Sequence, residues 1–415
     1  MNAPRVPAPL AGVRVVEFSQ MVMGPSCGLI LADLGAEVIK IEPLPRGDRS
    51  RYLPGIASGF FVSFNRNKKS LAVNMKSPRG LALIRDLIAT SDVVIENFRP
   101  GMMARQGLDY VALAAANPRL IYCSLKGFLP GPYENRTALD EVVQMMGGLA
   151  FMTGLPGKPM RAGASVNDIM GGMFGVIAIQ AALRLREQTG KGQEVQAALF
   201  ENNAFLMAQS IAAEAITGIP SKPWSVKVPP WPVYDLFDTA DGSKLFIAIV
   251  GDGQWVDFCE EFGRRDWLTD PGLQTNAART DARALLIPQI QAIVAARPVT
   301  ELCAIFERLG LPFAPVRTPG ELVDDPHLNA SNGMVDMAGP AGRTVRIPAV
   351  PMAFDGERLG KRNDPPGIGS DSRQVLASMG LSAGEIDALF EEGVVGAEDA
   401  PPARVCDNEV PQQVA

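Results

Sequence analysis

Strand-like and helix-like segments alternate along the first 130 residues, and this alternation restricts the chain to few folds. Short runs rich in β-branched and other apolar residues occur at 13–18, 37–42, 70–75, 92–98 and 120–127. Segments with apolar residues at helical spacing lie between most of them, at 25–35, 77–90 and 109–118. Strands and helices that alternate at this distance form βαβ units. The sequence therefore predicts an α/β fold with a parallel sheet covered by helices.

The rest of the chain predicts further helices and a second, smaller domain. Helices are expected at 138–149, 168–188, 195–216, 253–263, 278–296, 299–309 and 371–391. A proline-rich segment at 219–237 is typical of a domain boundary, and a hairpin with an Ala-Asp-Gly turn follows it. We expect a large domain over 1–220, a small α+β domain over 221–335, and a return to the large domain over 336–415 that ends in a disordered tail.

Charge and composition exclude several classes of protein. The 39 Lys and Arg residues against 45 Asp and Glu residues give a net charge of −6, which provides no general positive field for nucleic acid. The N-terminus lacks the pattern of a secretory signal, and no stretch approaches the ~20 uninterrupted apolar residues of a membrane span. The five cysteines never form a CxxC pair, as is typical of a reducing compartment. We therefore expect a cytoplasmic protein that acts on neither nucleic acid nor membrane.

The single histidine, His327, narrows the possible chemistry further. A Ser-His-Asp triad, a Cys-His pair or a two-histidine metal site would each depend on this residue. It lies in the polar stretch DDPHLNA, where a solvated or capping residue is the ordinary interpretation. No GxxxxGK[ST] sequence occurs, no GxGxxG follows the first strand, and no carboxylate or histidine cluster has metal-ligand spacing. We expect no metal site.

Basic residues follow several of the predicted strands. Lys76, Arg99 and Lys126 come just after a strand, and Arg105 and the segment 65–69 lie nearby. The carboxyl ends of parallel strands form the ligand crevice of a doubly wound sheet. These residues could converge on a phosphate-rich small molecule, or they could be ordinary surface charges.

Asp168 lies among glycines and small residues in RAGASVNDIMGG (161–172), directly before a long apolar run. An aspartate at the start of a helix is often a capping residue. A carboxylate held in such surroundings can also be a nucleophile. The residues alone leave both interpretations open.

Several separate stretches together resemble one known family. They are LAGVRVVEFSQMVMGPSCGLILADLGAEVIKIE, FNRNKKSLAVNMKSPRG, DVVIENFRPG, SLKGF, the Asp168 stretch and TGKGQ. In this order, over nearly the whole chain to about residue 390, they are similar to the class III CoA-transferases. That family contains formyl-CoA, carnitine and dicarboxylate CoA-transferases and has α-methylacyl-CoA racemases as close relatives. The resemblance implies a Rossmann-like large domain, a smaller domain and a homodimer of two interlocked chains.

The resemblance also implies the site. Coenzyme A would be a substrate and acyl carrier, with no permanently bound cofactor and no metal. The positions that correspond to the family's CoA-binding residues are Met21, Val22, Met23, Val73, Asn74, Met75, Lys76, Asn97, Phe98, Arg99 and Arg105. The family's catalytic aspartate corresponds to Asp168, which would attack an acyl-CoA donor, become an acyl-aspartyl anhydride and then an aspartyl-CoA thioester, and pass CoA to a small carboxylic acid. The glycines at 163, 171 and 172 would let the thiol end of CoA approach, and the helix start would help keep the acid ionised.

Departures from the family pattern bear on the substrate. Leu139 precedes Asp140 where the racemases have a histidine, which argues against the alternative of a racemase-type isomerase. Val22 replaces a glutamine of the formyl-CoA branch, and the proline- and tryptophan-bearing segment replaces that branch's glycine loop, which argues against formyl or oxalate substrates. That segment could shape an acyl pocket or be linker packing.

Two further residues enter as candidate substrate contacts. Arg51 would meet a substrate carboxylate, or else be a surface arginine; Asp140 would line the site, or else be an ordinary helix N-terminal acid. A substrate-facing Arg51 would favour a short dicarboxylic acyl-CoA such as succinyl-CoA or mesaconyl-CoA, with transfer between two molecules or within one. A catalytically silent CoA-binding protein is the remaining alternative.

Overall fold

The computed structural model describes residues 8–226 and 229–397. The described chain divides into a large unit, residues 8–225 and 326–397, and a small unit within 226–325. The tail predicted to be disordered begins at Gly396, which lies in a strand of the sheet, so the prediction was wrong there; its residues from 398 onward, Cys406 included, lie outside the described residues. Cys27, Cys123 and Cys259 are buried free thiols, as a packing role for the cysteines predicts, and Cys303 is partly buried.

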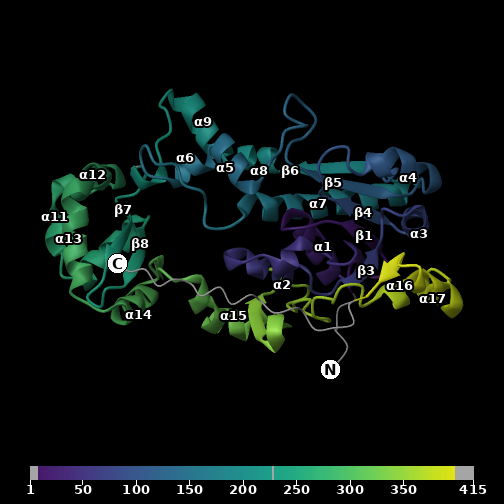
Figure 1. The fold of residues 1–415 in the computed structure, drawn as a ribbon. Helices are drawn as coiled ribbons and strands as arrows, with labels where there is room; N and C mark the ends of the chain where they lie inside the picture. Colours follow the sequence, from purple (N-terminus) through teal and green to yellow (C-terminus); the bar gives the residue numbers. More distant parts are fainter. Residues whose placement is uncertain (1–7, 227–228, 398–415) are drawn as a thin grey trace. The chain divides into compact units, whose positions relative to one another are not determined.

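The large unit is built on a seven-stranded sheet in its described part (Figure 1). Its strands are β1 (Arg14–Phe18), β2 (Glu37–Pro43), β3 (Lys69–Val73), β4 (Val93–Glu96), β5 (Ile121–Lys126), β6 (Glu194–Ala198) and β12 (Val395–Gly396). The strand order is β12-β3-β2-β1-β4-β5-β6, and every neighbouring pair is parallel except β12 and β3. The predicted α/β fold is confirmed, with an antiparallel edge strand that the sequence did not predict.

The order in which the chain adds strands to the sheet reverses at β1. The chain runs from β1 to β2 and β3 on one side, and then returns to place β4, β5 and β6 on the other. In open α/β sheets, ligands bind outside the carboxyl ends of the strands where the order reverses. The ends of β1 and β4 therefore mark the edge where a ligand is expected.

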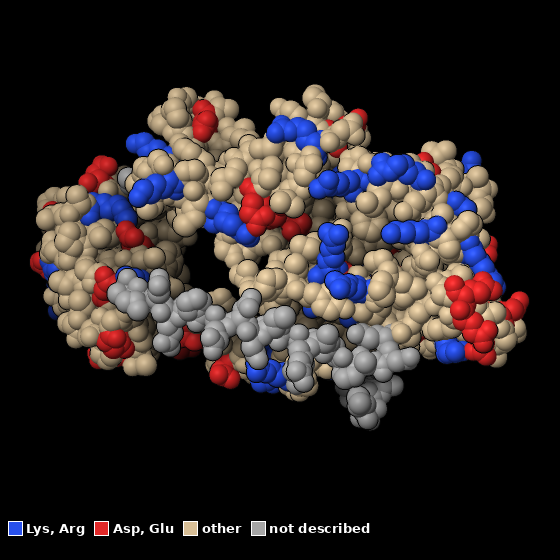
Figure 2. Space-filling model, viewed as in Figure 1, with Lys and Arg blue, Asp and Glu red and all other residues tan. Residues whose placement is uncertain are grey.

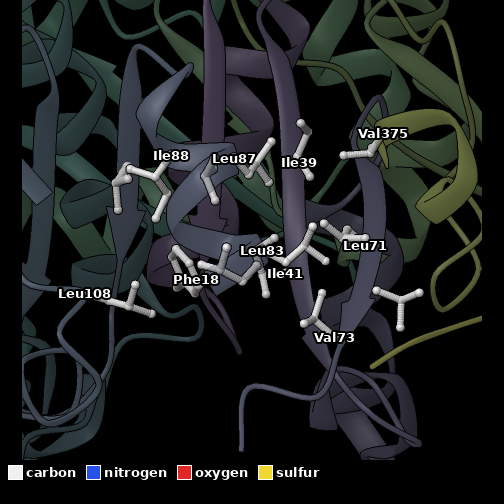
Figure 3. Close-up of a cluster of buried hydrophobic side chains, with 14 of the residues drawn as sticks. Phe18, Ile39, Ile41, Leu71, Val73, Leu83, Leu87, Ile88, Leu108 and Val375 are labelled. Atoms are coloured by element: carbon white, nitrogen blue, oxygen red, sulfur yellow. The ribbon is translucent and has the colours of Figure 1, made fainter. Parts of the chain in front are cut away.

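Helices cover both faces of the sheet. One face carries α1 (Met23–Asp33) and α7 (Val166–Thr189), and the other carries α3 (Pro78–Ala89), α4 (Tyr110–Ala116), α16 (Ser372–Ser378) and α17 (Ala383–Glu391). Because successive strand residues face opposite sides, Val15 belongs to the first core while Val16 and Phe18 belong to the second. Figure 3 shows the second core, in which Phe18, Ile39 and Ile41 meet Leu83 and Leu87 of α3. Full burial of such a side chain contributes roughly 1.5–3 kcal/mol.

Four predicted helices were wrong in part, and two of them, 138–149 and 278–296, are divided into two helices at 147–148 and at Ala282. The segment 195–216 forms β6, then α8 (Leu199–Leu206) and α9 (Ala208–Thr217), because the backbone of 194–198 pairs with β5 at the edge of the sheet. Such pairing overrides the helical preference of an alanine-rich sequence. The segment 371–391 breaks at Gly380, whose φ is +93°, and α17 restarts with a Ser382–Glu385 capping box.

Shorter elements complete the large unit. They are α2 (Phe60–Phe64), α5 (Asp140–Met146), α6 (Leu149–Thr153), α15 (Pro326–Ala330), and a hairpin of β10 (Met334–Ala338) and β11 (Thr344–Pro348). His327, expected in a loop, lies in α15.

The small unit combines a three-stranded antiparallel sheet with helices, as the sequence predicts. Its strands are β7 (Val233–Asp238), β8 (Lys244–Ile249) and β9 (Phe313–Pro315), and its helices are α10 (Asp252–Glu261), α11 (Arg265–Thr269), α12 (Asn276–Asp281), α13 (Arg283–Ala295) and α14 (Val299–Leu309). Trp255, Phe258 and Phe306 form the centre of its own hydrophobic core.

Helix α7 is long and apolar enough to cross a membrane by length and composition, although the sequence led us to expect no such segment. In the fold, α7 contacts α1, β5 and β6, and it carries Asp168 in its first turn. These contacts are those of a core helix of the large unit.

Candidate active site

Asp168 lies in the first turn of α7 and is half-buried. The backbone N–H groups of Asn167 and Asp168 donate hydrogen bonds to Oδ1 of Asp140, at 2.8 and 3.3 Å. Asp140, the first residue of α5 and only 3% exposed, thus caps the helix that carries Asp168. Within 8–226 and 229–397, no group donates a hydrogen bond to the Asp168 carboxylate itself. The capping role proposed for Asp168 therefore belongs to Asp140, and the Asp168 carboxylate has no structural partner.

The surroundings of Asp168 favour its protonated form. Burial, followed by the nearby charges of Asp140 and Glu141, raises the pKa of Asp168 to about 7, while Arg161 opposes the shift. The helix start was expected to help keep this acid ionised, but the net shift of its pKa is upward. A helix N-terminus supplies about 0.3–1 kcal/mol at an exposed site, whereas a shift of one pKa unit is already about 1.4 kcal/mol. Burial and two like charges therefore outweigh the helix terminus.

Glycines bring α7 against α1, the helix that follows β1. A Cβ atom at Gly172 would lie 2.9 Å from both the carbonyl oxygen of Met23 and the backbone nitrogen of Cys27. A Cβ at Gly171 would lie 2.3 Å from Cε of Met23, whereas Gly163 has open space around it. Gly171 and Gly172 therefore serve close helix packing rather than the approach of a ligand. The packing holds Asp168, one turn earlier, beside the start of α1.

The turn between β1 and α1 has an uncommon backbone. Met21 is in the left-handed region with a φ of +69°, which non-glycine residues rarely adopt. Asn97, after β4, holds this turn: its side-chain amide donates to the carbonyl of Gln20 at 2.9 Å, and its side-chain oxygen accepts from the Gln20 N–H at 3.1 Å. Met21 is 39% exposed, but Val22 and Met23 are buried. Of these three predicted CoA-binding residues, only Met21 can offer its side chain to a ligand.

A buried charge network lies beneath the same turn. Lys40 and Lys68 both pair with Glu17, and all three side chains are fully buried. Their ammonium groups also donate to the backbone, Lys40 to the carbonyl of Ser19 at 2.8 Å and Lys68 to that of Pro25 at 2.9 Å. Burial lowers the pKa of Lys68 to about 8. The network fixes both ends of the turn.

The basic segment 65–69 is therefore not a phosphate site. Arg66 pairs with Asp33 at 2.6 Å, and both side chains are buried. Lys68 belongs to the network with Glu17, and Lys69 pairs with Glu37 at 2.7 Å. Charges that the sequence presented as candidates for a ligand here hold the fold together.

Other basic residues are exposed at the edge of the sheet where a ligand is expected. Lys76 follows β3, Arg99 follows β4 and Arg105 lies in the short 3-10 helix Ala104–Gln106, and all three are exposed. Lys126 instead pairs with Glu96 at 2.5 Å. Figure 2 shows many Lys and Arg side chains over the part of the molecule where Figure 1 places β4, β5, α3 and α4.

The remaining predicted CoA-binding positions are distributed over the same two strand ends. Val73 is buried at the end of β3, and the positions that are half-buried beyond β3 and β4 are Asn74, Met75, Asn97 and Phe98. Because β3 and β4 both run parallel to β1, these segments lie at one edge of the sheet.

Arg51 makes a complete set of contacts inside the large unit. It bonds to both carboxylate oxygens of Glu42, at 2.9 and 2.6 Å, and to the carbonyl of Pro366 at 3.0 Å. Its guanidinium carbon lies 3.6 Å from the centre of the Phe61 ring. A contact with a substrate carboxylate stays a prediction for this residue.

A cavity of about 400 Å³ lies where the proline- and tryptophan-bearing segment begins. Its lining residues are Met152, Thr153, Met207, Gln209, Ser210, Trp224 and Ser225. Ser225 donates a hydrogen bond to the carbonyl of Gly154 at 2.9 Å, which ties the segment to α6. The mostly apolar lining suits an acyl chain.

Two residues near Asp168 were missed by the sequence analysis. Glu141 and Arg161 form an ion pair beside Asp140, and both act on the pKa of Asp168. Arg161 opens the stretch that contains Asp168, so its position in the sequence was visible, but its pairing with α5 was not. Among the described residues, no group of three or more His, Cys, Asp or Glu side chains could hold a metal ion.

Comparison with known protein families matches residues 10–372 to the family described as CoA-transferase family III. The chain belongs to this family. The resemblance inferred from the sequence is thereby confirmed, and the protein is a class III CoA-transferase.

This CoA-transferase is similar along its length to several relatives. It is 33% identical to the succinate–glutarate CoA-transferase of Agrobacterium fabrum, over 91% of this chain and 97% of that one. It is 30% identical to the succinyl-CoA–D-citramalate CoA-transferase of Chloroflexus aurantiacus, over 95% and 100%. A crystal structure of a CAIB/BAIF family protein from Brucella suis matches with a TM-score of 0.80 and 33% identity, over 90% of this chain and 99% of that one.

Proposed function

We propose that this CoA-transferase moves CoA between short dicarboxylic acids through a covalent intermediate on Asp168. The observation that carries the proposal is the Asp168 carboxylate itself, which is half-buried, has no hydrogen-bond donor among the described residues, and lies on a helix packed against the turn after β1. A carboxylate with a structural role would be paired. One kept free beside the expected ligand edge is suited to attack.

The reaction follows from the chemistry of thioesters. The Asp168 carboxylate attacks the thioester carbonyl of the donor, the carbon–sulfur bond breaks, and an acyl-aspartyl anhydride and CoA thiolate result. The thiolate attacks the aspartyl carbonyl, which releases the first acid and leaves an aspartyl-CoA thioester. The carboxylate of the acceptor attacks this thioester and again displaces the thiolate, which then takes the new acyl group from the anhydride. Asp168 is regenerated, and no net proton or electron is consumed.

The candidate residues have different roles in the proposed reaction. Lys76, Arg99 and Arg105 bind the phosphates of CoA at the ends of β3 and β4, and the turn at Met21 contacts the nucleotide through its backbone and its exposed side chain. Asp140 orients the first turn of α7 through its bonds to the backbone. Two relatives act on succinyl, glutarate and citramalate substrates, as their names state, which supports a dicarboxylic acyl group of four or five carbons.

We also propose that the enzyme is a homodimer. Large apolar side chains are exposed on the helices around Asp168, among them Met173 and Ile177 of α7 and Phe205 of α8. Apolar side chains that gather on a protein surface typically mark an interaction site. A second copy of the chain, as the family resemblance implies, would cover it.

Trapping the intermediate tests the proposed function. The enzyme is incubated with succinyl-CoA, mesaconyl-CoA and formyl-CoA in turn, treated with hydroxylamine, digested and analysed by mass spectrometry. We expect a hydroxamate at Asp168 with a dicarboxylic donor and none in Asp168→Asn. Turnover without any modification at Asp168 would overturn the proposal.

A further inference from the structure

Three carboxylates and one guanidinium group lie together at the start of α7. The carboxylates are those of Asp140, Glu141 and Asp168, and the guanidinium is that of Arg161. Nη2 of Arg161 lies 3.7 Å from Oδ2 of Asp140, its Nη1 bonds to Oε1 of Glu141, and its Nε donates to the carbonyl of Ala162 at 3.0 Å. The surroundings of the proposed nucleophile are therefore net negative.

This charge is unfavourable for the substrates of the proposed reaction. A dicarboxylic acid that reacts through one carboxylate keeps the other ionised throughout. Two like charges at 4 Å repel by about 4 kcal/mol at an effective dielectric constant near 20. Because Asp140 and Glu141 lie near Asp168, a second carboxylate bound there is favoured by a nearby cation.

We propose that Arg161 binds the unreacting carboxylate of the dicarboxylic acyl group and so selects diacids over monoacids. The inference rests on the function proposed above and specifies its substrate class. The substrate carboxylate takes the place of Glu141 on the guanidinium, whose planar fork matches a carboxylate in two parallel hydrogen bonds. Glu141 then faces solvent.

Because the ion pair of Arg161 with Glu141 is partly exposed, replacing Glu141 by a substrate carboxylate costs little free energy. The side chains of Arg161 and Glu141 are 37% and 48% exposed, and an ion pair at this exposure contributes only about 0–1 kcal/mol. Arg51 offers a contrast, because its side chain is 13% exposed and its partner Glu42 is fully buried. Opening that pair would leave a buried carboxylate without its partner, which typically costs about 3–5 kcal/mol. Of the two arginines, Arg161 is the one that can change partners.

A comparison of diacid and monoacid acceptors with the same number of carbons tests the inference. Initial rates are measured with the wild-type enzyme and with Arg161→Gln, Arg161→Lys and Glu141→Gln, using succinate and butyrate, then glutarate and valerate, against one acyl-CoA donor. Trapping of Asp168 by hydroxylamine is measured in parallel with each variant. We expect Arg161→Gln to raise the KM of the diacids about 10- to 100-fold, as the loss of a charge-assisted pair of about 1.5–3 kcal/mol implies, with the KM of the monoacids changed far less. Arg161→Lys should restore part of the preference, and Glu141→Gln should strengthen it.

The outcomes separate this inference from the proposed function. Equal losses for diacids and monoacids in Arg161→Gln, with Asp168 still trapped, would overturn the role of Arg161 and leave the proposed function standing. A wild-type enzyme that prefers monoacids would also overturn it. Absence of the hydroxamate in the wild-type enzyme would instead remove the proposed function.

Discussion

At the scale of single residues, Asp140 affects both the position and the pKa of Asp168. Its carboxylate accepts hydrogen bonds from the backbone of Asn167 and Asp168 and so fixes the first turn of α7. The same negative charge, with burial and Glu141, raises the pKa of Asp168. Asp140 therefore both positions the proposed nucleophile and contributes to the rise of its pKa.

The rate of the first chemical step should depend on this ionisation. In the proposed reaction only the carboxylate form of Asp168 attacks, and its pKa is about 7, so we expect the rate at which the acid of the donor is released to fall as the pH drops below neutrality. Glu141→Gln removes one like charge and should move the inflection to lower pH. Rapid-mixing measurements of the release of the donor's acid over a range of pH check both statements.

A second variant controls for a general effect of charge on this pH profile. Glu187 lies near the other end of α7 and is exposed, so Glu187→Gln should leave the inflection unchanged. Equal shifts in the two glutamine variants would contradict a local effect of Glu141 on Asp168.

At the scale of elements, the crossing of α1 and α7 sets the position of Asp168. Gly172→Ala places a methyl group against the backbone of Met23 and Cys27, so the helices must separate. Overpacking of this kind typically destabilises a fold by about 1–3 kcal/mol. We expect a lower midpoint in thermal and urea unfolding and a loss of kcat beyond the loss of folded protein.

Gly163→Ala is the matched control for this substitution. Gly163 precedes the same helix, but a Cβ there would meet nothing within 4 Å. Its unfolding midpoint should stay close to that of the wild-type enzyme. If the two alanine variants were equally stable, the close approach of α1 and α7 would not be what Gly172 is needed for.

Most strands of the large sheet could be predicted from the sequence, but its two edge strands could not. Strands β1 to β5 were found because their apolar runs are continuous and helices alternate with them. β6 and β12 were not, because their backbones become strands only by pairing with β5 and β3. At the site, Asp168 and the basic residues after the strands followed from the motifs. The partners of Lys68 and Arg161 could not be predicted from the sequence. Glu17 is 51 residues from Lys68, and the ion pair of Arg161 with Glu141 depends on where α5 lies.

At the scale of the whole molecule, the exposed apolar side chains of α7 lead us to predict a dimer in solution. Met173, Ile177 and Leu185 of α7 are 48%, 60% and 43% exposed. If a second copy covers them, sedimentation should give a mass near twice the 44.3 kDa of one chain. Ile177→Lys should shift the enzyme toward monomers, because burying an unpaired charge in the interface is costly.

An exposed apolar residue elsewhere provides the comparison for Ile177. Val111 of α4 is 78% exposed, and we expect Val111→Lys to leave the sedimentation behaviour unchanged. A wild-type enzyme that sediments as a single chain at micromolar concentration would rule out the homodimer.

The two-residue strand β12 has a consequence for how the protein is made. Val395 pairs with Val73, Gly396 pairs with Ala72, and the carbonyl of Val394 accepts a hydrogen bond from the N–H of Asn74 at 2.8 Å. While the ribosome is still elongating the chain, the outer side of β3 therefore lacks its neighbour, and an open strand edge invites pairing with other chains. A nascent chain that stalls before residue 394 keeps this edge bare beside the segment that leads to Lys76. The edge of β3 is therefore covered only after residue 396 has been translated, more than 300 residues after β3 itself.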